Sequence, residues 1–114
     1  MLLEPAVESP AAARAYCDEI LGSTVRTAIR EDARLVVSEL VTNAVIHART
    51  TIELSILVDG SALRIEVTDY GSDRPQVWAR DESGRGIPII EALAHDWGVV
   101  EFGSAKTVWC EIAV

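Results

Sequence analysis

The sequence predicts an α+β fold in which helices cover one face of a mixed, mainly antiparallel sheet. Three observations support this two-layer sandwich. Two neighbouring segments alternate apolar and polar residues around an Asp-Gly pair, three other segments have helical spacing, and no apolar run approaches the ~20 residues of a membrane helix. With 114 residues, the chain is long enough for one domain, residues 1–114, and too short for two.

Two long helices are expected in the first half of the chain. The first has Ser9 as a suitable N-cap, Pro10 at its first helical position and Gly22 just after its end. The second runs from about residue 29 to residue 48. Because its apolar residues lie nearly all round the helix, this second helix is predicted to be covered on more than one side.

The segments TIELSILV, residues 51–58, and ALRIEVTD, residues 62–69, are predicted strands. Asp59-Gly60 between them suits a tight turn, so we expect an antiparallel hairpin. A third helix is expected over about residues 87–94. Two strands, around residues 98–101 and 106–112, complete the chain, and the predicted inward face of the last one carries Val108, Cys110 and Ile112.

Composition narrows the classes of function. The net charge is −8 and there is no basic stripe, so phosphate backbones would repel the domain and nucleic acid is not an expected partner. The first residues lack a basic segment followed by a long apolar stretch, so we expect neither a signal peptide nor a membrane association, and a cytoplasmic location. Cys17 and Cys110 stand alone in apolar surroundings and are predicted to be buried free thiols.

The stretch SELVTNAVIHA, residues 38–48, places three polar residues four apart. At 3.6 residues per turn, Glu39, Asn43 and His47 fall within an arc of about 80° on one helix face. Burying an unpaired carboxylate costs several kcal/mol, so these groups must meet an internal network, solvent, a ligand or a metal ion. A zinc site on Glu39 and His47 lacks a third ligand at suitable spacing. The residues alone leave the other readings open.

Two glycine-containing motifs follow. Asp69 ends the apolar face of its strand, and Gly71 would let a flat ligand approach the backbone, although Asp before Gly also commonly caps a turn. Gly84 and Gly86 precede the third helix, where backbone N–H groups suit phosphate, although such pairs are common in loops. The intervening segment, about residues 70–86, is predicted to be a long functional loop.

Taken in order, these motifs resemble those of the GHKL ATPases, the histidine-kinase-like superfamily with the Bergerat fold. Glu39, Asn43 and His47 with Ala48 match the N box of that superfamily, the DYG of residues 69–71 matches its first glycine box, and the GRG of residues 84–86 its second. The DWGV and KTVWCEI segments near the end resemble the small anti-sigma-factor serine kinases. The edge strand that usually precedes the first helix looks abbreviated here.

The resemblance implies an ATP site between the second helix and the sheet, under a lid loop of about residues 70–86. Asp69 would accept the adenine amine, Gly71 would leave room for the ring, and Thr107 would support the adenine end. Asn43 would ligate Mg²⁺, a hard cation suited to oxygen donors.

At the phosphate end, the resemblance assigns Gly84, Arg85 and Gly86 to binding the phosphates, and Glu39 to the role of general base beside the γ-phosphate. His47 would either touch the ligand or pack and orient the end of the helix. The first glycine box departs from the pattern of the superfamily, because Asp73 stands where a glycine is usual.

By resemblance, the expected function is that of an ATP- and Mg²⁺-dependent serine/threonine protein kinase. It would phosphorylate a small anti-anti-sigma antagonist, sequester a sigma factor and form a homodimer. The alternative is a nucleotide-binding partner-switching module without kinase activity. Glu39 favours the kinase, whereas Asp73 and the abbreviated N-terminal strand favour the binding module.

Overall fold

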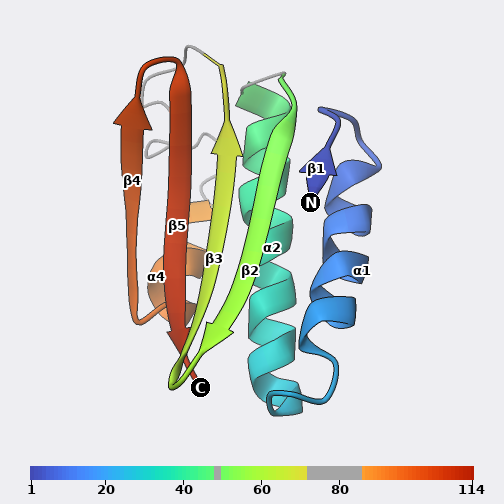
Figure 1. Cartoon of the computed structure of the whole chain (residues 1–114), viewed down its shortest axis with the longest axis vertical. Coiled ribbons are helices and arrows are strands. Elements are labelled where there is room, and N and C mark those ends of the chain that lie inside the picture. The colour runs from blue at the N-terminus through green and yellow to red at the C-terminus, as the bar shows by residue number, and fades with distance from the viewer. Residues whose placement is uncertain (48–49, 72–85) are drawn as a thin grey trace.

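The computed structural model describes residues 1–47, 50–71 and 86–114, and it confirms the α+β class. The elements are β1 (Leu2–Leu3), α1 (Ser9–Leu21), α2 (Thr27–His47), β2 (Ile52–Asp59), β3 (Ala62–Asp69), α4 (Gly86–Leu93), β4 (Asp96–Phe102) and β5 (Ala105–Ala113). Helices α1, α2 and α4 lie on one side of the sheet, with α2 between the other two (Figure 1). In the described part of the chain, no helix is long and apolar enough to cross a membrane.

The sheet has the order β1-β2-β3-β5-β4. Every strand pair that the structure describes is antiparallel, so the predicted sheet is confirmed without a parallel pair among these residues. The β2–β3 hairpin is also confirmed, and Asp59 pairs with Ala62 at its end. The two connecting residues are therefore Gly60 and Ser61, one position later than the predicted turn. Gly60 has a φ of 62°, in the left-handed region that glycine adopts at little cost.

Alternation along the strands decides which side of the sheet is buried. In β2, β3 and β5 every second side chain faces the helices, and all of these but the half-buried Val58 are buried, whereas the intervening residues face outward. The predicted inward face of β5 is confirmed, since Val108, Cys110 and Ile112 are all at most 4% exposed. We call the two sides the helix face and the open face of the sheet.

The helix boundaries differ from the predicted ones by small amounts. α1 begins at Ser9 itself, and the Ser9 hydroxyl donates to the carbonyl oxygen of Glu4, so the predicted N-cap role of Ser9 is wrong. Gly22, with a φ of 48°, follows the last helical residue as predicted. β1 has only two residues, which agrees with the abbreviated first strand. The free, buried state of Cys17 and Cys110 is confirmed.

Candidate functional site

One side of α2 is occupied by its contacts with α1, so a site on α2 has to lie on another side. Arg34 pairs with an α1 carboxylate at 3.4 Å, and Ser38 accepts a hydrogen bond from an α1 arginine at 2.8 Å. Glu39 and Asn43 each follow one of these residues by five positions, which places them about 140° further round the helix. They therefore lie away from the side of α2 that contacts α1.

The polar row on α2 differs in exposure along its length. Asn43 is 3% exposed, whereas Glu39 and His47 are half-buried. A side-chain amide at this depth has to be held by hydrogen bonds or by a ligand, because losing water without a replacement is costly. The row thus has a buried amide, Asn43, at its centre, and on either side a half-buried side chain that solvent can still reach.

Asp69 ends β3 on the helix face and is 3% exposed. The backbone N–H of Gly71 donates to Oδ1 of Asp69 at 3.1 Å, which is the turn-capping role considered for this residue. A carboxylate has about four lone-pair sites, so Asp69 can serve this turn and accept other hydrogen bonds as well. Asp69 therefore combines a local structural role with the capacity to accept a hydrogen bond from a ligand.

Thr107 lies on the other face of the sheet. It is directly opposite Thr68, and the two Oγ1 atoms are 2.7 Å apart, whereas Asp69 is opposite Lys106. Opposed residues of an antiparallel pair share a face and neighbours along a strand do not. The structure therefore separates Thr107 from Asp69, against the expectation that Thr107 supports the adenine end, and puts Lys106 on the helix face instead.

Lys106 is the residue that the sequence interpretation missed. It is 2% exposed and is the only lysine in the chain. The signal was present in the alternation of β5, because position 106 has the same parity as the inward-facing Val108, Cys110 and Ile112. A lysine in a row of buried apolar residues is rare, because lysine is almost never fully buried unless it is paired.

The predicted phosphate-binding residues are described only in part. Gly86 is the first residue of α4, so the third helix is confirmed with a start one position earlier than predicted. Gly84, Arg85 and Asp73 lie outside the described residues, as does most of the predicted lid loop.

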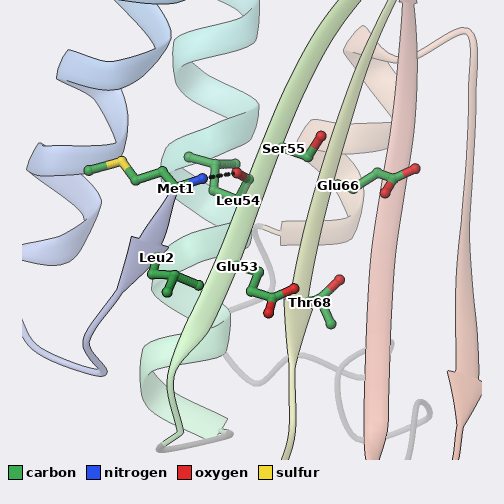
Figure 2. A pocket seen from close by; sticks show the side chains of 7 residues that line it. All are labelled: Met1, Leu2, Glu53, Leu54, Ser55, Glu66 and Thr68. Atoms are coloured by element: carbon green, nitrogen blue, oxygen red, sulfur yellow. Dashed lines mark hydrogen bonds between the residues drawn. The ribbon is translucent and has the colours of Figure 1, made fainter.

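A separate hollow of about 270 Å³ lies on the open face beside β1 (Figure 2). It is lined by Glu53 and Ser55 of β2, by Glu66 and Thr68 of β3, and by Met1, Leu2 and Leu54. These β3 side chains face away from the helices, unlike Asp69. The hollow is therefore distinct from the predicted site.

Comparison with known sequences identifies the family of the chain. The profile described as the histidine kinase-like ATPase domain matches residues 3–110. The chain belongs to this family. An uncharacterized protein of Streptomyces coelicolor is 37% identical over 68 residues, which are 55% of this chain and 64% of that protein. The match thus spans somewhat less than two thirds of the length of that relative.

Solved structures of other proteins have the same fold. The structure of the RsbU and RsbW domains of Rv1364c from Mycobacterium tuberculosis superposes with a TM-score of 0.73 at 20% identity, over 98% of this chain and 30% of that one. The histidine kinase domain of the blue-light activated kinase of Erythrobacter litoralis gives 0.61 at 22% identity, over 90% of this chain and 58% of that one. At these identities the likeness shows the fold, and it confirms the expected Bergerat architecture.

Proposed function

We propose that the domain binds ATP with Mg²⁺ between the Glu39–Asn43 flank of α2 and the helix face of β3 and β5. The observation that carries this proposal is the burial of Asn43 and Asp69, both 3% exposed, in a chain of the histidine kinase-like ATPase family. Their chemistry fits the ligand, since a carboxylate accepts a hydrogen bond from an amine and an amide oxygen suits a hard cation.

In this proposal each residue has one role. Asp69 accepts a hydrogen bond from the adenine amine, and Gly71 leaves space for the ring. Asn43 supplies an oxygen to Mg²⁺, and Gly84, Arg85 and Gly86 bind the phosphates at the start of α4. When bound, Mg²⁺ supplies positive charge that offsets the charge of the phosphates.

Glu39 carries the proposed chemistry. One turn before Asn43 and half-buried, it accepts the proton of a serine or threonine hydroxyl as that oxygen bonds to the γ-phosphorus. The bond from this phosphorus to the β–γ bridging oxygen breaks, and ADP leaves. The acceptor is a small anti-anti-sigma antagonist, and the domain works as an anti-sigma-type serine/threonine protein kinase that also sequesters a sigma factor, as a homodimer.

The alternative is a nucleotide-binding partner-switching module without phosphotransfer. Asp73 and the two-residue β1 favour it, because an added carboxylate beside the pocket, pointing inward, would weaken the affinity for nucleotide. The two functions share the nucleotide site and differ in the role of Glu39.

Binding of nucleotide is the first test. ATP and ADP are titrated, with and without Mg²⁺, into the wild-type protein, Asp69→Asn and the control Asp59→Asn, which changes an exposed aspartate at the far end of β2. We expect Asp69→Asn to lose at least tenfold in affinity and its preference for adenine, since its amide donates as well as accepts, and Asp59→Asn to match wild type. No binding by the wild-type protein would overturn the proposal.

A further inference from the structure

Strand β4 lies at one edge of the sheet and, in the part of the chain that the structure describes, pairs with β5 alone (Figure 1). Its outer side therefore presents backbone N–H and C=O groups that no described strand pairs. Natural proteins commonly protect such an edge with a short strand, a lysine, a proline or a bulge. β1, at the opposite edge, has two residues, whereas β4 has seven, without lysine or proline, and its register with β5 is unbroken from Asp96 to Phe102.

The side chains of β4 leave apolar surface on both faces of the sheet. Trp97 and Val99 lie on the helix face, where they pack against the core but are only half-buried. On the open face, Val100 is 47% exposed and Phe102 is 58% exposed. A long edge strand with exposed apolar side chains beside its unpaired backbone is suited to the addition of another strand.

The order of charges along β4 favours a second copy of this chain as the partner. In an antiparallel pair of two β4 strands, with a two-fold axis at Val99 and perpendicular to the sheet, all seven residues of each strand are paired. Asp96 is then opposite Phe102 of the second copy, and Trp97 is opposite Glu101 of the second copy. Like charges directly opposite one another would destabilise such a pair, and this register opposes no carboxylate to another.

We propose that two copies of the chain associate through β4, in an antiparallel pair that joins their two sheets into one. The inference extends the homodimer of the proposed function by naming its surface, and it does not depend on the nucleotide site. The pair satisfies the outer backbone groups of β4 and covers part of the apolar surface on both faces. Because both copies use the same strand, every contact occurs twice, and the assembly closes at two copies.

The test measures association by sedimentation over a range of protein concentrations. Phe102→Asp puts a carboxylate opposite Asp96 of the second copy, twice in each dimer, whereas Phe102→Lys puts an ammonium group there. Both variants remove the same exposed ring, so the sign of the charge distinguishes them. We expect Phe102→Asp to raise the Kd of the dimer roughly 10- to 100-fold, and Phe102→Lys to keep it within about tenfold of wild type.

Two further variants make the test specific. Leu57→Asp is the matched control, because Leu57 is 57% exposed on the open face of β2, far from the β4 edge in the order of the strands, and it should associate as wild type does. Asp96→Lys combined with Phe102→Asp places opposite charges across the pair again and should bring the Kd back to within about tenfold of wild type. Circular dichroism verifies that each variant is folded.

The outcomes separate this inference from the nucleotide site. A wild-type protein that stays monomeric would overturn the β4 pair and the homodimer, whatever its affinity for ADP. A dimer that Phe102→Asp and Phe102→Lys weaken equally, or that Leu57→Asp weakens as much as Phe102→Asp, forms through another surface and overturns the β4 pair alone. A dimer with the expected charge dependence that fails to bind ADP would overturn the nucleotide site and support the β4 pair.

Discussion

The guanidinium carbon of Arg64 lies 4.4 Å from the centroid of the Trp109 ring, on the open face of the sheet. Arg64 also donates to Glu66 at 2.6 Å and to Glu111 at 3.0 Å, so the cation is held over the ring by two carboxylates. On β4, directly opposite Trp109, stands Gly98. One layer on the open face, outside the core, is therefore formed by Arg64 of β3, Trp109 of β5 and Gly98 of β4.

Gly98 is predicted to be required for the position of Trp109. A Cβ atom at residue 98 would lie 2.9 Å from Nε1 of Trp109 and 3.0 Å from two of its ring carbons, so the ring would have to move and would leave its stack with Arg64. We expect Gly98→Ala to lower the free energy of unfolding by about 1–3 kcal/mol, measured by urea denaturation.

The matched control for this prediction is the same change in a Trp109→Ala background. With the ring absent, Gly98→Ala should cost less, and the difference between the two backgrounds measures the crowding. An equal cost in both backgrounds would show that the glycine matters for another reason, such as backbone freedom.

Glu39 is predicted to act in phosphotransfer and not in nucleotide binding. With a cognate antagonist protein and ATP·Mg²⁺, Glu39→Gln should transfer phosphate roughly 10²- to 10⁴-fold more slowly, because the general base is lost, while ADP affinity stays within about twofold. The rate is followed by transfer of labelled phosphate. Glu31→Gln, an exposed glutamate on the same helix, is the control and should keep the wild-type rate. Unchanged phosphorylation in Glu39→Gln would remove Glu39 as the general base, whereas no phosphotransfer by the wild-type protein to any cognate antagonist would favour the binding module.

Regular patterns made much of the fold predictable. The alternation of TIELSILV and ALRIEVTD determined both faces of the β2–β3 hairpin, because a strand that buries one face must repeat every two residues. Gly22 ended α1 as expected, since few residues other than glycine adopt a positive φ without strain. Ser9 was misassigned because the carbonyl of Glu4 competes for its hydroxyl, a contact that requires the chain to fold back before the helix.

The candidate site was less predictable from the sequence than the fold. The resemblance offered Thr107 for the adenine end, yet face assignment depends on register, and pairing with β3 puts Thr107 on the open face and Lys106 on the helix face. A motif match indicates which segment contributes to a site. The parity of the strand decides which of two adjacent side chains enters it.

Asn43 is predicted to couple nucleotide affinity to Mg²⁺. In wild type, the affinity for ATP should be higher with Mg²⁺ than without it. In Asn43→Ala these two affinities should be nearly equal, because the amide oxygen that binds the cation has been removed. Calorimetric titration of ATP with and without Mg²⁺ measures the ratio. Thr42→Ala, the preceding residue on α2, about 100° round the helix, is the control and should retain the wild-type ratio. A Mg²⁺ effect that persists in Asn43→Ala would remove the residue from the metal site.

The buried thiols should make the fold lose stability in alkaline solution. Burial raises the pKa of Cys17 from 9.0 to about 11 and that of Cys110 from 9.0 to about 12. Below pH 9 both states hold these protons, so the thiols contribute no pH dependence. Above pH 9 the unfolded chain releases them first, so the free energy of unfolding falls by up to about 1.4 kcal/mol per pH unit for each thiol, until the folded pKa is reached. Urea denaturation between pH 8 and pH 11 should show a steeper fall in wild type than in a Cys17→Ala, Cys110→Ala variant. Parallel curves would mean that the thiols ionise alike in both states.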